Sequence, residues 1–301
     1  RSLLGQSEFE SPFYSPVFTQ AVAAVRPDVQ VAILTGDDGA SAFLPFQFAS
    51  AIARRLRIAE RVGGEMSDYF GLIAAPGTLL TPRLLLRLCK LQGLEFSHLD
   101  DFQQSFGLEG EKPEPGLRIA LEDGAVAYWT ALRQQNKRLV ADTERRLRKL
   151  SELHGPLRFE WEAAARGPEL ARLIDAKRAQ YSRTGVMDAL GEPWTEALLE
   201  VLSKTADVDC HGTLSVLYAG ETWVASHFGL RRGRVLHYWF PVYNADMAEF
   251  SPGRLLLKSV IDAAPAYGIG LIDRGAGSQP AKAEFANASH TFRRGLWYAP
   301  G

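Results

Sequence analysis

Four side chains in the second half of the sequence could carry out acid–base chemistry. His227 and His237 each lie within an apolar stretch, and an imidazole takes up or releases a proton near neutral pH. Asp273 ends another apolar stretch just before a glycine-containing loop, and Tyr243 ends the stretch that contains His237. Two alternatives stay open. Buried histidines more often bond to a backbone carbonyl, and Asp273 could close an Asx turn or pair with Arg274.

A second group of residues has the order expected of an anion-binding helix start. Ser251 and Pro252 suit the N-cap and the first position of a helix, where backbone N–H groups have no partner within the helix. Gly253 would let a phosphate approach the backbone, and the cationic Arg254 follows it. Many capped helices bind nothing, so a purely structural role for these residues is an equally good interpretation.

These residues need a strand–helix–strand framework to position them, and the sequence from 234 onwards predicts one. Apolar and aromatic runs indicate buried strands, and helical periodicity appears between them. Gly268 is placed to end the helix. The predicted elements are strand 234–243, loop 244–250, helix 255–264, strand 269–273, loop 274–278 and short helix 280–288.

The remainder of the chain also alternates between helix and strand patterns. Expected helices cover 12–25, 82–91, 125–154, 168–181 and 193–202. Expected strands cover 29–34, 41–48, 94–99, 117–121, 157–161, 213–218, 223–230 and 291–298. The basic segment 54–61 predicts a strand or an exposed loop. The segment 107–116 is rich in Gly, Pro and Glu and is the best candidate for a linker.

Helix 125–154 is the longest expected element and carries a cluster of positive charge. Seven Lys or Arg residues lie from Arg133 to Lys149, against only Asp142 and Glu144. Such a helix could meet an anionic substrate, a CoA phosphate or RNA. A solvated helix face is the plainer alternative, because Lys and Arg are good helix formers.

Composition limits the class of protein. A chain of 301 residues with 46% hydrophobic residues can bury one large core or two ordinary ones, and a net charge of −1 argues against bulk attraction to nucleic acid or membrane. Cys89 and Cys210 form no redox or metal spacing, which predicts reduced thiols in a cytoplasmic protein. No apolar run is long enough to predict a transmembrane helix. His227 and His237 lack a third zinc ligand with a supporting spacing, so no metal is expected.

Several segments, taken in order, resemble the CelD-like (cellulose-biosynthesis-associated) acetyltransferases of the GNAT superfamily, which are related to the Fem-type aminoacyl transferases. The segments that carry the resemblance are Glu10–Phe18, Leu44–Phe46, Ser67–Gly71, the basic stretch 133–149, Tyr243–Leu257 and Ile272–Gly277 followed by Lys282. Two departures stand out. Ala281 precedes Lys282 where the family usually has an aromatic residue, and Phe250–Arg254 has fewer glycines than the usual pyrophosphate loop.

The resemblance implies an α+β fold with a GNAT-like mixed sheet flanked by helices, in two GNAT-like units in tandem. The implied division is an acceptor-side domain 1–120, a linking helix 121–155 and an acyl-CoA-binding domain 156–301. It also implies a backbone N–H that polarises the thioester, for which Val242 is the candidate because Pro241 has none. The implied cofactor-binding residues are Val242, Phe250, Ser251, Gly253, Arg254 and Lys282, and the implied acceptor-binding residues are Asp68 and Tyr69.

The function implied is acyl transfer from acetyl-CoA, or another acyl-CoA, to a small-molecule or saccharide acceptor, without a metal. A link to polysaccharide or cell-envelope biosynthesis follows from the family only. Two alternatives stay open. The basic helix favours a Fem-type aminoacyl transferase that uses charged tRNA. The two departures favour a binding module that kept the fold and lost the reaction.

Overall fold

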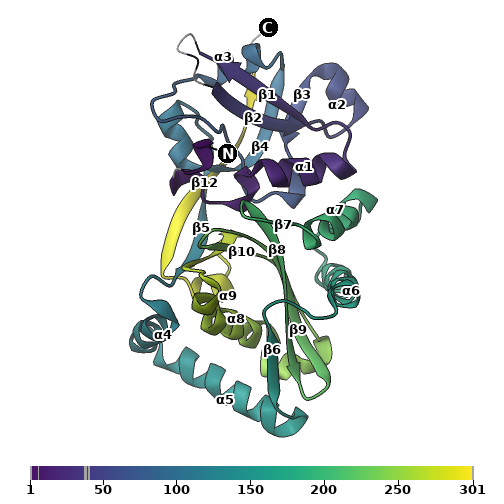
Figure 1. Cartoon of the computed structure of the whole chain (residues 1–301), viewed down its shortest axis with the longest axis vertical. Helices are drawn as coiled ribbons and strands as arrows, with labels where there is room; N and C mark the ends of the chain where they lie inside the picture. Colours follow the sequence, from purple (N-terminus) through teal and green to yellow (C-terminus); the bar gives the residue numbers. More distant parts are fainter. Residues whose placement is uncertain (1, 6, 37–38, 40, 300–301) are drawn as a thin grey trace. The chain divides into compact units, whose positions relative to one another are not determined.

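The computed structural model describes residues 2–5, 7–36, 39 and 41–299 (Figure 1). The chain forms two compact units. Unit 1 consists of Arg1–Leu117, Ala276–Ser278 and Ser289–Gly301, and unit 2 consists of Arg118–Gly275 and Gln279–Ala288. The chain passes from unit 1 to unit 2 within strand β5 (Lys112–Ala120), and its last segment returns to unit 1. The functional division at 120 and 155 stays a prediction.

Unit 1 is a mixed sheet with short helices. Its elements are α1 (Pro16–Val25), β1 (Gln30–Thr35), β2 (Ser41–Gln47), α2 (Ala51–Leu56), β3 (Ile58–Arg61), α3 (Pro82–Leu88), β4 (Gly93–Asp100) and β12 (Ala288–Tyr298). The strand order is β1-β2-β3-β4-β12. All neighbouring pairs are antiparallel except β3 and β4, which run parallel and are connected through α3.

Unit 2 repeats this scheme on a larger scale. Its helices are α4 (Gly124–Gln135), α5 (Lys137–His154), α6 (Arg166–Thr184), α7 (Pro193–Ser203), α8 (Pro252–Ala263) and α9 (Pro280–Ala283). Its strands are β6 (Leu157–Glu160), β7 (Ala206–Asp207), β8 (Cys210–Ala219), β9 (Thr222–Arg232), β10 (Val235–Tyr243) and β11 (Leu271–Ala276). The order is β11-β10-β9-β8-β6, with β7 paired to β8. Only β10 and β11 run parallel, and α8 connects them.

Helices cover both faces of the unit 2 sheet, with α4, α5 and α8 on one face and α6 and α7 on the other (Figure 1). The helix α8 presents Leu255, Leu256, Val260 and Ile261 to the sheet, all fully buried. These side chains join two apolar clusters, one shared with both α4 and α5 and the other shared with α5. Because both faces are covered, β8 to β10 are almost continuously buried, which explains their apolar sequences.

The α+β class predicted from the sequence is confirmed, and each unit contains the antiparallel meander followed by a helix and a parallel strand. The predicted strand over 234–243 and the helix that begins at Pro252 are also present. These elements were predictable because their apolar periodicity and their start and stop residues are local in sequence.

Three local predictions were correct over only part of their length. The helix over 125–154 is interrupted at Asn136, whose side chain accepts a hydrogen bond from the Leu139 backbone N–H and so begins α5 as a separate helix. The segment 54–61 is divided between α2 and β3, with Arg57 in a left-handed conformation (φ 56°) at the junction. The expected linker over 107–116 contains the first residues of β5.

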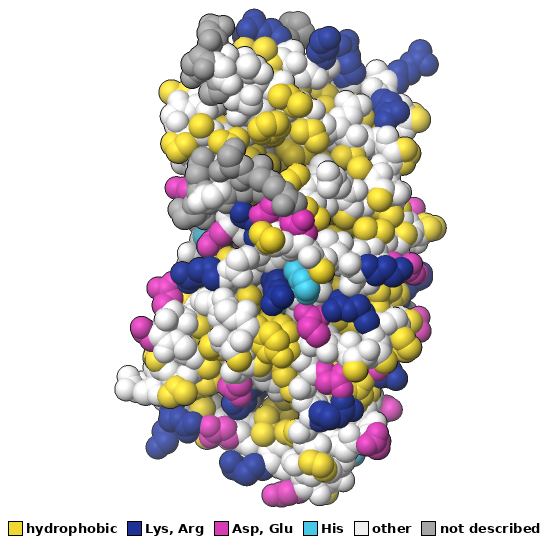
Figure 2. Space-filling view, viewed as in Figure 1, with side chains coloured by type: hydrophobic (Ala, Val, Ile, Leu, Met, Phe, Trp, Pro, Cys, Tyr) yellow, Lys and Arg dark blue, Asp and Glu magenta, His cyan; other side chains and the backbone are white. Residues whose placement is uncertain are grey.

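Charged side chains are distributed without a dominant sign. Figure 2 shows Lys and Arg interspersed with Asp and Glu over most of the face in view. This agrees with the formal net charge of −1. Local clusters of charge, rather than the charge of the whole protein, must therefore guide any charged ligand.

Candidate functional site

A pocket of about 430 Å³ opens in unit 2 beside the point where β10 and β11 stop pairing. The two strands run parallel from Val235 opposite Leu271 to His237 opposite Asp273, with no later pair among the described residues. Just beyond, the pairing of β10 with β9 shifts register between His237 and Phe240. A bulge of this kind bends a strand, so β10 can diverge from β11.

Five predicted residues lie around this cavity, which we call the β10–α8 pocket. Its lining residues come from α6, β10, the segment before α8, the first half of α8, β11 and the region of α9. They are Gln180, Tyr238, Pro241, Val242, Tyr243, Ala248, Ser251, Pro252, Gly253, Arg254, Leu257, Arg274, Ala281, Glu284 and Phe285. The predicted members are Val242, Tyr243, Ser251, Gly253 and Arg254. The predicted cofactor residues Phe250 and Lys282 are not in the lining; Phe250 is buried in the apolar cluster below α8.

The start of α8 is shaped for close approach of a ligand. A Cβ atom added at Gly253 would meet only a ring carbon of Tyr243, at 3.8 Å, so the glycine leaves open space beside the pocket. Ser251 occupies the predicted N-cap position, but it adopts a left-handed conformation (φ 55°) and its side chain makes no cap hydrogen bond. Its carbonyl accepts hydrogen bonds from the N–H groups of Arg254 and Leu255, at 2.9 and 3.2 Å.

A cluster of arginines borders the pocket on the α5 side. The Arg254 guanidinium donates to Asp142 Oδ2 at 3.0 Å, and its other end lies 3.9 Å from Glu284. Asp142 also accepts hydrogen bonds from Arg146 and Arg145, at 2.7 and 2.5 Å. These hydrogen bonds, from Arg146 first and then Arg145, lower the pKa of Asp142 to about 2. Three arginines thus share two carboxylates, which leaves net positive charge beside the start of α8.

The helix α5 is held close to the pocket by both polar and apolar contacts. Lys149 Nζ donates to Glu249 at 2.8 Å, and Arg146 donates to the Glu249 backbone carbonyl. Leu150 packs in one cluster with Phe250 and Leu255. The basic helix singled out in the sequence therefore lies against the loop that precedes α8.

Lys177 is a buried cation beside the pocket that the sequence analysis missed. Its side chain extends from α6 and donates to the Pro241 carbonyl at 3.0 Å and to Gln180 at 3.4 Å. Burial, and secondarily the charge of Lys282, lowers the pKa of Lys177 to about 8. A signal was present, because position 177 follows Leu170, Leu173 and Ile174 at helical spacing and so belongs to the apolar face of α6.

The depressed pKa of Lys177 predicts a pH-dependent stability difference. An unfolded lysine titrates near 10.4, so between about pH 8 and 10.4 the unfolded state binds more protons and folding becomes more favourable as pH rises. Relative to Lys177→Met, the wild-type free energy of unfolding should rise by about 2 kcal/mol from pH 7 to pH 10. Urea denaturation of both proteins measures this. A difference that is constant with pH would show that Lys177 titrates normally.

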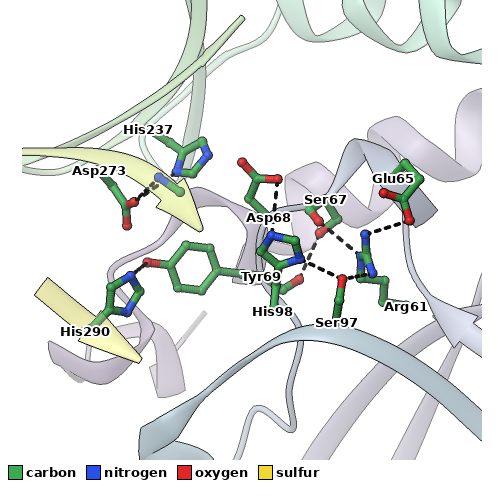
Figure 3. A network of polar contacts seen from close by, with 11 residues as sticks. Arg61, Glu65, Ser67, Asp68, Tyr69, Ser97, His98, His237, Asp273 and His290 are labelled. Atoms are coloured by element: carbon green, nitrogen blue, oxygen red, sulfur yellow. Dashed lines mark hydrogen bonds and ion pairs between the residues drawn. The ribbon is translucent and has the colours of Figure 1, made fainter. Parts of the chain in front are cut away.

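Two of the predicted catalytic residues, His237 and Asp273, lie side by side as the last parallel pair of β10 and β11 (Figure 3). His237 Nδ1 is 3.7 Å from Asp273 Oδ1, and both residues are only 1% exposed. Asp273 also accepts a hydrogen bond from the Gly275 N–H at 2.8 Å and lies 3.3 Å from Arg118 Nε. The carboxylate thus closes the Asx turn considered above, and its arginine partner is Arg118. Neither residue lines the β10–α8 pocket.

His227 is fully buried on β9 and also lies outside the pocket lining. Its ring stacks on Tyr238, with ring centroids 4.1 Å apart. Burial, and then the nearby His237, lowers the pKa of His227 to about 3. The imidazole is therefore neutral at physiological pH. Its catalytic role stays a prediction.

The predicted acceptor residues Asp68 and Tyr69 lie in unit 1 (Figure 3). Tyr69 is buried, and its hydroxyl lies 3.4 Å from His290 Nε2, while His290 Nδ1 lies 3.1 Å from Asp100. Asp68 is partly exposed, 4.0 Å from His98 Nε2. His98 in turn helps to line a hollow of about 700 Å³ on unit 1. Asp68 is thus the more accessible of the two.

Among the described residues no group of three His, Cys, Asp or Glu side chains is placed to hold a metal ion. None of the described helices combines the length and apolar character needed to cross a membrane.

Comparison with known proteins agrees with this geometry. The family model of the acetyltransferase (GNAT) domain matches residues 136–283, which include α5, most of the residues that line the β10–α8 pocket, and Lys282. This region therefore resembles a GNAT-type acetyltransferase domain. A comparison with curated proteins gave no match.

Solved structures similar to this chain share its fold along most of its length. The C-terminal domain of a putative lysylphosphatidylglycerol synthetase from Agrobacterium fabrum has a TM-score of 0.59 and 13% identity, over 97% of this chain and 88% of that one. FemX has a TM-score of 0.58 and 10% identity, over 92% and 90%. A conserved protein of unknown function from Bacteroides thetaiotaomicron has a TM-score of 0.51 and 10% identity, over 92% and 88%. Identities this low establish the fold alone.

Proposed function

We propose that this protein transfers an acyl group, acetyl in the first instance, from acyl-CoA to an amine or hydroxyl acceptor. The β10–α8 pocket carries this proposal, because it combines diverging strands, an open glycine at a helix start and adjacent arginines. Gly253 and the first turn of α8 would face the pyrophosphate, and Arg254 with the arginines of α5 would neutralise the remaining phosphate charge.

The chemistry is a direct displacement. The acceptor nitrogen or oxygen attacks the thioester carbonyl carbon, the new C–N or C–O bond forms, and the C–S bond breaks to release CoA as a thiolate. The acceptor proton passes to a base, and the thiolate is then protonated. We propose the N–H of Val242 as the donor that polarises the carbonyl, and Asp273, His237, His227 and Tyr243 as candidates for proton transfer. Lys282 is proposed to contact the ligand, and Asp68 and Tyr69 the acceptor.

Lys177 is a further candidate for proton transfer. With a pKa of about 8, a useful fraction of its amine is neutral near physiological pH, and its contact with the Pro241 carbonyl places it beside the pocket wall. A role in polysaccharide or cell-envelope biosynthesis rests on the sequence resemblance to CelD-like proteins.

A second candidate function is aminoacyl transfer from charged tRNA. It is favoured by exposed cations of α5 that make no ion pair within the described chain, namely Lys137, Arg138 and Arg148. The structural similarity to FemX is compatible with this candidate. Against it, Arg145 and Arg146 of α5 are engaged with Asp142, and Lys149 is engaged with Glu249.

Calorimetric titration separates the two candidates and the non-catalytic alternative. We expect acetyl-CoA and CoA to bind the wild-type protein with micromolar affinity, and a panel of amines to give acetyl-CoA turnover. Binding without turnover of any acceptor would favour the binding module. Failure to bind acetyl-CoA, together with salt-sensitive tRNA binding that Arg138→Glu/Arg148→Glu abolishes, would replace the proposal with the aminoacyl transferase.

A further inference from the structure

The Tyr238 hydroxyl is a buried polar group in the β10–α8 pocket that lacks a hydrogen-bond partner in the described part of the chain. The residue is 6% exposed, and its hydroxyl makes no hydrogen bond to any described residue. Burial raises the pKa of the phenol, so the hydroxyl keeps its proton and can act as a hydrogen-bond donor. Stacking on the neutral His227 ring, with an interplanar angle of 7°, holds the phenol ring in place. An unpaired buried hydroxyl is costly to maintain.

Arg274 supplies a second such donor from β11. Its terminal nitrogen donates to the backbone carbonyls of Lys282 and Ala281, at 2.8 and 3.2 Å, which anchors the guanidinium on α9. Its Nε atom is buried and has no hydrogen-bond partner among the described residues. Arg274 is close enough to Tyr238 for its charge to act on the phenol. Both side chains line the same pocket.

Two unpaired donors in one pocket define the chemistry of what binds there. An arginine N–H can only donate, so the ligand atom that meets it must be an acceptor. Tyr238 and Arg274 line the pocket from β10 and β11, whereas Gly253 lines it from the start of α8. If the phosphates lie at Gly253, the acceptor near Tyr238 belongs to the arm that leads away from the phosphates. In acyl-CoA that arm carries two amide carbonyls and the thioester carbonyl.

We propose that Tyr238 and Arg274 bind carbonyl oxygen of the acyl-pantetheine arm of the donor. This assignment rests on the proposed function. The two side chains act as ligand-binding residues whose hydrogen bonds form only when the donor enters. Because these hydrogen bonds are made to the pantetheine arm, the pocket should bind a donor with the full arm more tightly than the nucleotide portion alone.

The test is Tyr238→Phe, which removes one oxygen atom and leaves the ring. We expect the Kd for acetyl-CoA to rise about tenfold, the value for one hydrogen bond to a buried donor. The Kd for adenosine 3′,5′-bisphosphate, which lacks the pantetheine arm, should stay unchanged. The melting temperature should not fall, because the deleted hydroxyl makes no hydrogen bond to any described residue. Arg274→Lys keeps the positive charge and removes Nε, so this variant should also bind acetyl-CoA more weakly.

Tyr128→Phe is the matched control. Tyr128 is buried in the same apolar cluster, but its hydroxyl already donates to the Phe285 carbonyl at 2.7 Å. This variant should therefore show the opposite pattern, a lower melting temperature with unchanged affinity for acetyl-CoA.

The outcomes are distinct. Unchanged acetyl-CoA affinity in Tyr238→Phe, or an equal loss for adenosine 3′,5′-bisphosphate, would overturn the assignment while leaving the proposed function in place. If Tyr238→Phe loses affinity for acetyl-CoA but not for CoA, the group that Tyr238 contacts is the thioester carbonyl. If it loses affinity for both ligands, the group is an amide carbonyl. Absence of acetyl-CoA binding by the wild-type protein would overturn the proposed function and this assignment together.

Discussion

Replacing Gly253 with Trp should abolish acetyl-CoA binding without unfolding the protein. We expect the affinity to fall at least about 100-fold, which corresponds to about 2.7 kcal/mol. The indole would extend from the first turn of α8 into a cavity of about 430 Å³, where the phosphates are proposed to lie. Calorimetric titration of wild-type and variant protein measures the loss directly.

The fold should tolerate this change because the backbone and the surrounding space both permit a side chain. Gly253 does not adopt a left-handed conformation, and an added Cβ would approach only the Tyr243 ring, at ordinary contact distance. A loss of affinity indicates a ligand site at Gly253 only if the variant is still folded. The circular dichroism spectrum and melting temperature of the variant must therefore be measured beside its affinity.

Gly167→Trp is the matched control. Gly167 also lies in the first turn of a helix, α6, and an added Cβ there would meet no atom within 4 Å. It is exposed and outside the β10–α8 pocket. This variant should bind acetyl-CoA like the wild type. Full affinity in a folded Gly253→Trp protein would move the phosphate site away from α8.

The second large effect should come from Asp273, whose removal should destabilise unit 2. Asp273→Ala leaves Arg118 without its carboxylate and the Gly275 N–H without its acceptor, both in a largely buried setting. Removing one partner of a buried ion pair typically costs about 3 kcal/mol or more. We expect a loss of about 3 kcal/mol in the free energy of unfolding, measured by urea denaturation.

Glu122→Ala provides the comparison for this effect. Glu122 also pairs with an arginine, Arg234, at 2.7 Å, but both side chains are more than half exposed. An exposed pair contributes about 0.5 kcal/mol or less, so this variant should be nearly as stable as the wild type. Equal stability of Asp273→Ala and wild type would show that Asp273 has no structural role.

Asp273→Asn separates that structural role from the proposed catalytic one. The amide oxygen can still accept from the Gly275 N–H, while the negative charge is lost. Because Asp273 does not line the pocket, acetyl-CoA affinity should stay within about twofold. If Asp273 takes part in proton transfer, turnover should fall at least about tenfold in the same folded protein. Unchanged turnover would assign proton transfer to another candidate.

Local signals in the sequence were sufficient to predict the framework of unit 2. Pro252 at a helix start, the apolar run of β10 and the stop near Gly268 are local signals, because capping, proline geometry and apolar periodicity act over a few residues. The same locality explains why the sequence alone places Gly253 and Arg254 at the start of a helix. Local signals do not predict the contacts of these residues, because they contain no information about which distant side chains meet.

The partners of these residues depend on contacts between segments that are far apart in the sequence. Arg254 meets Asp142 across 112 positions of sequence, and Lys177 meets the Pro241 carbonyl across 64. Tyr238 and Arg274 come together because β10 and β11 pair in parallel and then separate, which depends on register and on a bulge. Register is set by packing of whole strands against α6 and α8, so no window of residues encodes it. The polarity of the pocket, and hence its chemistry, therefore came from the fold.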